Sequence, residues 1–304
     1  MDTHPPPPLR QASTVILVRE KNLAFEVYLL RRSNASGFMD GLYVFPGGVV
    51  DPEDKGLESW APYVDLDPAA MEQQLGGTGF SGEDVLSFSI AAIRETLEEA
   101  GVLIALTENR AKTDLDQICA FRLNKDLPKS WFRVKIMAEK WTLSLSSLAP
   151  WSHWITPALM KKRFDTRFFI VSMPQGQTCI PDDTETHQGI WLTPQKALEQ
   201  NLELSLPLSP PTVVTLTGLS AYKSFRELQQ VIRTRTWGDP ISPCLVPSPD
   251  GPLILEPWDP LWGSGEKVDM SGLQKKSCPR APGFHGYGVR PVSGNPWGSD
   301  SRTE

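Results

Sequence analysis

The amino-acid sequence predicts an α/β protein. Residues 13–19 and 25–30 are rich in Val, Leu, Ile and aromatic side chains and flank a short polar turn, a pattern typical of two paired β-strands. Residues 91–100 are good helix formers and end at Gly101, where a C-terminal cap is expected. Further along, residues 190–198 combine a short strand with a helix. Strands and helices that alternate along the chain favour an α/β architecture.

One large folded domain is predicted over residues 11–262. The 304 residues are 40% hydrophobic, which is enough to fill a core. Residues 1–10 contain four consecutive prolines and predict an extended, disordered lead-in. Residues 263–304 are rich in Gly, Pro, Ser and charged side chains with little to bury, and predict a disordered tail.

Smaller elements are predicted from local patterns. Helices are expected at residues 68–75, 114–124, 131–139, 213–219 and 222–234, and strands at residues 102–105 and 168–171. The segment 239–262 carries many prolines and is expected to wrap over the domain.

Charge and cysteine usage limit the class of partner. The net charge is −6 and the sequence has no long block of Lys and Arg, so we expect a small ligand and no nucleic acid. The four cysteines form no C-x-x-C pair and are expected to be free thiols in a reducing compartment. The N-terminus has no signal-peptide pattern, and no apolar run is long enough to cross a membrane. We therefore expect a cytoplasmic protein with no membrane partner; the oligomeric state is not predicted.

Three glutamates in the helix at residues 91–100 indicate a metal site. At 3.6 residues per turn, Glu95 projects beside both Glu98 and Glu99. The like charges repel one another, and they lie in the C-terminal half of the helix, where its dipole disfavours anions. A hard divalent cation such as Mg²⁺ would reverse that cost. The alternative is a charged helix face that simply contacts solvent.

A glycine-containing turn lies upstream of this helix. Residues 43–46 form a short apolar segment that leads into Gly47 and Gly48, where the backbone is free to approach a ligand. Together the two stretches resemble the Nudix hydrolases, whose signature is G-x5-E-x7-R-E-U-x-E-E-x-G-U with U an aliphatic residue. The matching positions are Arg94, Glu95, Glu98, Glu99, Gly101 and Val102.

The chain departs from that signature in two ways. Thr96 stands at the first aliphatic position. Gly48 lies forty-six residues before Arg94 where the signature places fourteen, so about thirty-two residues are inserted, at about residues 52–82. We expect this insert to form a lid or rim. The early Glu of the signature is assigned equally well to Glu53 or to Glu83.

The resemblance implies an α/β/α sandwich with a mixed sheet and extra helices. It also implies that Mg²⁺ or Mn²⁺ is held against a diphosphate by Glu95, Glu98, Glu99 and the carbonyl of Gly48. Glu98 or an acid of a late loop, for which Glu185 is the candidate, would accept the proton of the attacking water. Arg94 would orient a carboxylate through an ion pair. The base is not identified by sequence.

Coenzyme A or an acyl-coenzyme A is the predicted substrate, with 3′,5′-ADP and 4′-phosphopantetheine as products. The chain resembles, over about residues 11–262, the subgroup that includes the peroxisomal coenzyme A diphosphatase and its bacterial relatives. The candidate substrate-binding residues are Arg32, Arg163 and Arg167 for phosphate and Phe38 with Met39 for apolar contact. The alternatives are a hydrolase of ADP-ribose, NADH or another dinucleotide, and a non-catalytic module that binds a nucleotide.

Overall fold

The computed structural model describes residues 7–33, 41–77, 79–108, 111–124, 126–158, 160–182, 186–246, 253–255 and 257. The strands are β1 Leu9–Lys21, β2 Ala24–Arg32, β3 Tyr43–Val44, β4 Gly47–Val49, β5 Ala149–Ile155, β6 Arg163–Ser172, β7 Thr186–Leu192, β8 Cys244–Val246 and β9 Leu253–Leu255. The α-helices are α1 Leu57–Trp60, α2 Pro68–Leu75, α3 Gly82–Ala100, α4 Lys112–Phe121, α5 Trp131–Glu139, α6 Pro194–Leu202, α7 Pro210–Leu219 and α8 Phe225–Ile232. Short 3-10 turns are η1 Pro52–Asp54, η2 Ala61–Tyr63 and η3 Leu145–Ser147.

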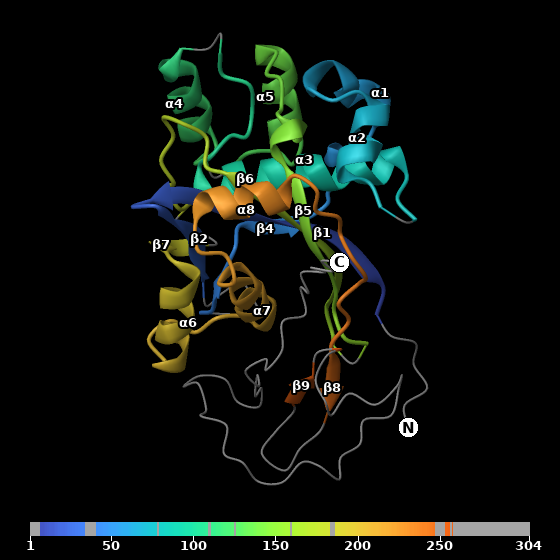
Figure 1. The fold of residues 1–304 in the computed structure, drawn as a ribbon. Coiled ribbons are helices and arrows are strands. Elements are labelled where there is room, and N and C mark those ends of the chain that lie inside the picture. Colours follow the sequence, from blue (N-terminus) through green and yellow to red (C-terminus); the bar gives the residue numbers. More distant parts are fainter. Residues whose placement is uncertain are drawn as a thin grey trace, which may run out of the picture.

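A mixed sheet forms the centre of the fold (Figure 1). Its strand order is β3-β2-β1-β6-β5, with β4 paired to β1 and β7 paired to β2. Strands β1 and β6 are parallel from Leu9↔Arg163 to Val18↔Ser172, and the other pairs are antiparallel. Along one edge β1 pairs first with β4 and later with β2. The sheet therefore divides beside Gly47 and Gly48.

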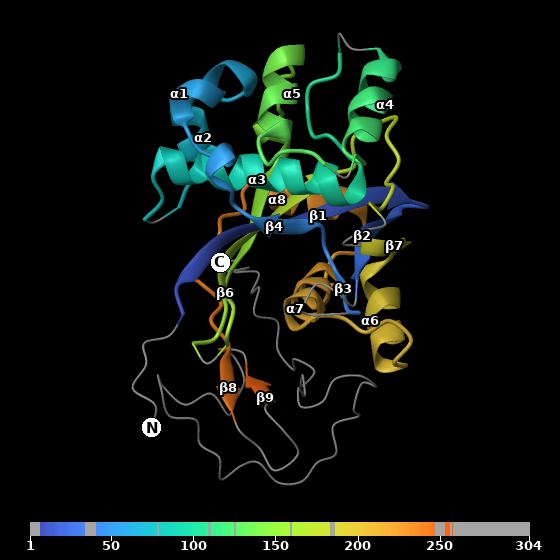
Figure 2. The same ribbon diagram turned by 180° about the vertical axis from the view of Figure 1, so that it is seen from behind.

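Alternation along β1 separates two hydrophobic layers. Val15 and Leu17 pack in a core cluster with α3, whereas Ile16 and Val18 pack in a second cluster with residues of α7 and α8. Figures 1 and 2 show α1, α2, α4 and α5 on the same side of the sheet as α3, with α6 and α7 on the other side. This arrangement confirms the predicted α/β/α sandwich.

Helix α3 has a well-defined start and end. Ser81 and Asp84 form a capping box at its N-terminus, and Gly101 adopts a left-handed conformation at φ 69° after its last turn. Thr96, which replaces an aliphatic residue of the signature, is fully buried and donates its hydroxyl hydrogen to the carbonyl of Ala92. The substitution therefore leaves no unsatisfied polar atom at this position.

The insert at residues 52–82 is a packing element, and the prediction of a lid or rim was wrong. It contains η1, α1, η2, α2 and the start of α3. Trp60, Met71 and Leu75 are fully buried in the same cluster as α3. None of the described insert residues lines the cavity beside the glutamates. Its apolar side chains stabilise the helix that carries those glutamates.

Several local predictions are confirmed, with shifts at the ends. Helix α2 has the predicted bounds, as does α5, and the strand β1 begins at Leu9 rather than at residue 11 or later. Thr193 caps α6 by accepting a hydrogen bond from the backbone of Lys196. Cys119 and Cys179 are free thiols, as expected. The tail predicted at residues 263–304 lies outside the described residues.

The strand predicted at residues 102–105 is not formed. Leu103 instead exchanges both of its backbone hydrogen bonds with the side-chain amide of Gln177. Ala105 makes one isolated bridge to Leu143. The segment is apolar because it is buried. A side chain satisfies the backbone of Leu103, and the carbonyl of Ile104 accepts from the backbone N–H of Ser144. No described helix is both long and apolar enough to cross a bilayer.

Candidate active site

A cavity of about 1010 Å³ lies beside the C-terminal half of α3. Glu95, Glu98 and Glu99 all line it, and the backbone of β4 lies next to them. The strands β1, β5 and β6, the N-terminus of α7 and residues 122–131 form most of the rest of its lining. The cavity therefore brings together the two stretches that the sequence singled out.

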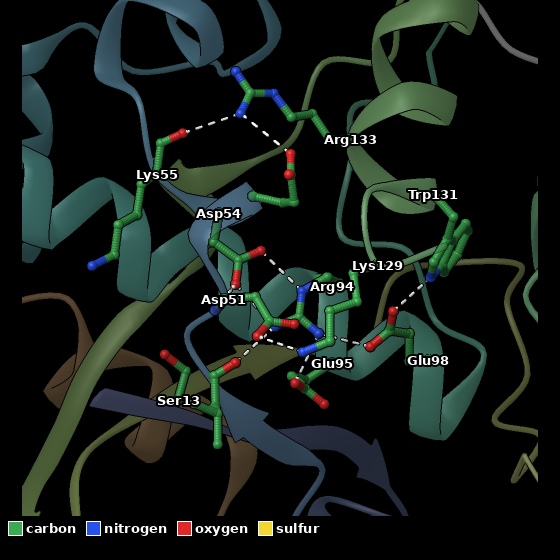
Figure 3. A network of polar contacts seen from close by, with 12 residues as sticks. Ser13, Asp51, Asp54, Lys55, Arg94, Glu95, Glu98, Lys129, Trp131 and Arg133 are labelled. Atoms are coloured by element: carbon green, nitrogen blue, oxygen red, sulfur yellow. Dashed lines mark hydrogen bonds and ion pairs between the residues drawn. The ribbon is translucent and has the colours of Figure 1, made fainter. Parts of the chain in front are cut away.

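Arg94 is the centre of the polar network on one side of this cavity (Figure 3). Its side chain is only 5% exposed. The Nε and Nη2 atoms donate to the two carboxylate oxygens of Asp54, both at 2.9 Å, and Nη2 also donates to the carbonyl of Val49 at 2.8 Å. Nη1 donates to Glu95 at 2.8 Å and to Glu98 at 2.7 Å. Burial alone would lower the pKa of Arg94, but its acidic partners hold that pKa above the usual value.

Glu95 lies against the backbone of Gly48. A Cβ atom at position 48 would overlap the Glu95 carboxylate, so only glycine allows this approach. Burial, opposed by Arg94 and reinforced by Glu98, raises the pKa of Glu95 to about 7. The carboxylate is therefore held in a position where its own charge is unfavourable.

The two following acids are held by different donors. Glu98 Oε2 accepts from Arg94, and Oε1 accepts from the indole Nε1 of Trp131 at 2.7 Å. Burial raises the pKa of Glu98, while the Arg94 charge and these hydrogen bonds act in the opposite direction. Glu99 Oε2 accepts from the backbone N–H of Gly47 at 2.9 Å. All three acids are thus fixed relative to the glycine turn.

The donor set fits a hard divalent cation. Carboxylates from adjacent turns of α3 reach one cavity and contact the Gly47–Gly48 backbone. Within the described ranges, no three acidic, cysteine or histidine side chains converge closely enough to enclose a metal ion. Mg²⁺ needs no such enclosure, since it keeps several waters and is completed by substrate phosphate oxygens. Glu95, Glu98, Glu99 and the carbonyl of Gly48 would hold it.

The structure places Asp54, and neither Glu53 nor Glu83, beside Arg94. Glu83 accepts hydrogen bonds from the backbone of Gly56 and Leu57, and Glu53 lies 3.6 Å from Arg133 near the surface. Asp54 lies six residues after Gly48, which is the spacing that the signature gives its first acid. Counting forward from Gly48 and accepting Asp in place of Glu would have found it. The inserted residues therefore begin after Asp54, and not at residue 52 as predicted.

Two of the predicted phosphate-binding arginines do not reach the cavity. Arg163 donates to the backbone carbonyls of Thr156 and Pro7, and Arg167 is buried with its guanidinium 3.8 Å from the ring centre of Phe80. Alternate residues of β6 face opposite sides of the sheet. The cavity side is occupied by Phe164, Thr166 and Phe168, so Arg163 and Arg167 lie on the other side.

Arg32 lines the cavity, which leaves its predicted phosphate contact possible in geometry, and the cavity also contains cations that the sequence did not single out. These are Arg10, Arg122, Lys129 and Lys162. Apolar surface is supplied by Phe45, Trp154, Ile155, Met160, Phe164 and Phe168. Strand register explains Arg10, because it pairs with Phe164 across the parallel β1 and β6 strands. The candidates Phe38, Met39 and Glu185 lie outside the described residues.

Removal of the buried acid should destabilise the protein. Asp54 is 1% exposed, and in Asp54→Asn the Arg94 charge would lose its bidentate partner. We expect a loss of about 3–5 kcal/mol of unfolding free energy, measured by chemical denaturation. Glu53 is the control, because its side chain is 40% exposed and pairs with Arg133 near the surface. Glu53→Gln should lower the unfolding free energy by less than about 1 kcal/mol. Equal losses in the two variants would contradict a central role of the Asp54–Arg94 pair.

The raised pKa of Glu95 predicts a pH dependence in the absence of divalent cations. Between pH about 4.5 and 7 the folded state holds the Glu95 proton while the unfolded state has released it, so this residue makes stability fall as pH rises. Glu95→Gln should therefore gain stability relative to the wild type over this window, by up to about 3 kcal/mol. Denaturation series in EDTA at pH 5 and pH 8 test the sign. A stability difference that does not change with pH would contradict it.

The comparisons with known proteins agree with this geometry. The family model for the NUDT19 Nudix domain matches residues 9–219. Acyl-coenzyme A diphosphatase NUDT19 of Xenopus laevis is 27% identical over 292 residues, covering 82% of this chain and 73% of that protein. The protein of the same name from Homo sapiens is 29% identical over 278 residues, covering 78% and 72%. A solved Nudix hydrolase from Alicyclobacillus acidocaldarius shares the fold, with a TM-score of 0.58 and 23% identity over 76% of this chain and 99% of that one. Because the family model spans most of the chain and the acids of α3 lie within it, the protein belongs to the NUDT19 Nudix domain family.

Proposed function

We propose that the protein hydrolyses the diphosphate of coenzyme A or of an acyl-coenzyme A, with Mg²⁺ or Mn²⁺ as cofactor. The observation that carries this proposal is the position of Glu95 and Glu99 against the Gly47–Gly48 turn, with Glu98 on the same helix, in a cavity that holds both cationic and apolar side chains. The names of the NUDT19 relatives support the same substrate.

The reaction is a hydrolytic cleavage of a phosphoric anhydride. A water oxygen bonds to one phosphorus while the bond from that phosphorus to the bridging oxygen breaks, which leaves two monophosphates. When bound, the divalent cation would neutralise the diphosphate and make the water more acidic. Glu98 or Glu185 would accept the water proton. Arg94 would not touch substrate, since its donors are directed at Asp54, Val49, Glu95 and Glu98.

The cavity offers suitable surfaces for both parts of coenzyme A. The 3′-phosphoadenosine requires cationic donors, for which Arg10, Arg32 and Lys162 are candidates, and the pantetheine arm requires apolar contact. Phe38 and Met39 remain proposed contacts from the sequence. Arg163 and Arg167 are not proposed to contact the substrate, because they lie on the side of β6 that faces away from the cavity.

A cytoplasmic location is part of the proposal. It is supported by the free thiols of Cys119 and Cys179, because thiols persist in a reducing compartment. The proposed partner is a small nucleotide-containing molecule rather than a nucleic acid, in keeping with the net charge of −6.

A substrate panel tests the proposed reaction. Purified protein with Mg²⁺ should cleave coenzyme A or acyl-coenzyme A with the highest kcat/KM among coenzyme A, NADH, ADP-ribose and diadenosine polyphosphates, with 3′,5′-ADP and a 4′-phosphopantetheine compound identified by mass spectrometry. Charge-assisted contacts to the 3′-phosphate contribute about 1.5–3 kcal/mol each, so dephospho-coenzyme A should be cleaved roughly tenfold or more less efficiently. EDTA should abolish turnover. A preference for NADH or ADP-ribose would show that coenzyme A is not the preferred substrate. Nucleotide binding without turnover would indicate a non-catalytic module.

The Glu98 side chain should be needed for turnover but not for folding. Loss of a metal ligand or proton acceptor predicts that Glu98→Gln lowers kcat by about 10²-fold or more. The matched control is Glu199→Gln on α6, whose carboxylate is 60% exposed and pairs with Lys196. Circular dichroism should show native secondary structure in both variants. A rate near that of the wild type would remove Glu98 from the reaction.

A further inference from the structure

Helices α4 and α5 both reach the end of α3 that carries Glu98. They belong to residues 103–148, between α3 and β5, which the sequence marked only as extra helices. Trp131, the first residue of α5, donates its indole N–H to Glu98 Oε1 at 2.7 Å. Arg122, which follows α4, donates from Nη1 to the backbone carbonyl of Glu98 at 2.6 Å. One acid is therefore held at both its side chain and its backbone by the same segment.

Packing fixes the orientation of the Trp131 ring. The residue is only 7% exposed. Its ring centre lies 6.0 Å from that of Phe121 on α4 and 5.9 Å from that of Phe132, with the second pair close to edge-on. Figure 3 shows the indole nitrogen directed at the Glu98 carboxylate. A ring that is held by neighbours on two helices orients its partner without a further loss of rotamer entropy.

The type of donor matters for a carboxylate that is proposed to hold a cation. Each carboxylate oxygen has two lone pairs, so Arg94 on Oε2 and Trp131 on Oε1 leave acceptor capacity on both oxygens. An indole N–H is neutral. It fixes the Glu98 rotamer without adding a second positive charge that would repel a divalent ion.

Arg122 holds the backbone from which Glu98 projects. Besides the Glu98 carbonyl, its Nη2 donates to the carbonyl of Ile180 at 2.5 Å. Cys119 on α4 donates its thiol hydrogen to the carbonyl of Gly101 at 3.1 Å. The last carbonyls of a helix have no partner within the helix, and a cation is favourable at that end. Residues 103–148 therefore complete the C-terminal end of α3.

We propose that Trp131 is a positioning residue for Glu98, and that residues 103–148 thereby form part of the metal site. This inference rests on the proposed function for the role of Glu98 as a ligand. Its consequence is that removal of one N–H, far from the glycine turn, weakens cation binding. Partners that orient a metal ligand typically change metal affinity or activity by about 10–100-fold when they are removed.

The test is Trp131→Phe, which keeps an aromatic ring in the cluster and removes the N–H donor. The dissociation constant for Mn²⁺ is measured by electron paramagnetic resonance in the absence of substrate, and the Mg²⁺ concentration for half-maximal turnover is measured separately. Both values should rise by about tenfold or more in Trp131→Phe. Trp141→Phe is the matched control, because Trp141 is fully buried in the same segment and donates its indole N–H to Glu139 at 2.9 Å. It should leave Mn²⁺ affinity unchanged.

A double-mutant cycle separates positioning from general packing. If Trp131 acts through Glu98, Trp131→Phe should have little further effect on Mn²⁺ binding in a Glu98→Gln background. Unchanged Mn²⁺ affinity in Trp131→Phe, or equal losses in Trp131→Phe and Trp141→Phe, would overturn the inference. Weaker Mn²⁺ binding in Trp131→Phe would support it even if coenzyme A were not cleaved, so failure of the proposed substrate is distinguishable.

A measurement on proteins that keep Trp131 covers the case in which Trp131→Phe does not fold. An indole N–H resonance of the wild-type protein should shift on addition of Mg²⁺, and the same resonance should not respond in Glu98→Gln. If no indole resonance responds to saturating Mg²⁺ in the wild type, the inference is overturned.

Discussion

The buried guanidinium of Arg94 is the interaction on which the site depends. A charge removed from water costs several kcal/mol unless partners compensate it, and Arg94 is 5% exposed. Its compensation comes from Asp54 after β4, from the carbonyl of Val49 within β4, and from Glu95 and Glu98 on its own helix. The requirement to satisfy one cation therefore fixes α3 against the segment that carries the glycine turn. These contacts of Arg94 hold α3 against β4, where Glu95 and Glu99 reach Gly48 and Gly47.

This solution leaves an excess of negative charge. Asp54, Glu95, Glu98 and Glu99 outnumber the single guanidinium of Arg94. Burial, reinforced by the neighbouring Glu98 carboxylate, raises the pKa of Glu95. The three glutamates also lie near the C-terminal end of α3, where the helix dipole opposes them. A divalent cation bound here, as proposed, would offset this unfavourable charge. The proposed site would then give up some stability of the cation-free protein in return for affinity for the ion.

The sequence predicted the elements that depend on local patterns, and it failed where tertiary structure decides. The period of α3, its Gly101 cap and the acids at positions 95, 98 and 99 could be recognised without coordinates. Arg163 and Arg167 alternate with Phe164 and Phe168, and nothing local tells which set faces the cavity. That choice depends on the parallel pairing of β6 with β1.

Two other omissions have different causes. Asp54 stands at the spacing from Gly48 that the signature gives its first acid, but the signature specifies a glutamate at that position. Trp131 was not detectable, because it meets Glu98 only when α5 packs against the end of α3. The insert at residues 52–82 misled for a third reason: its Pro, Gly and acidic content suggested a surface lid, whereas Trp60, Met71 and Leu75 are fully buried. Composition averaged over a segment conceals a few large apolar side chains that decide its position.

The two added segments support opposite ends of the same helix. Within the insert, Gly56 and Leu57 donate their backbone N–H groups to Glu83 in the first turn of α3, while Arg122 and Trp131 hold its last turn. Most of the remaining cavity surface comes from β1, β5, β6 and α7, which belong to neither segment, with an additional contribution from residues 122–131. In the proposed function, support of the helix that carries the acids and recognition of the substrate would thus lie on largely separate parts of the chain. They would meet at residues 122–131, where the segment that holds Glu98 also lines the cavity, so a substitution there would be expected to change ion affinity and substrate preference together.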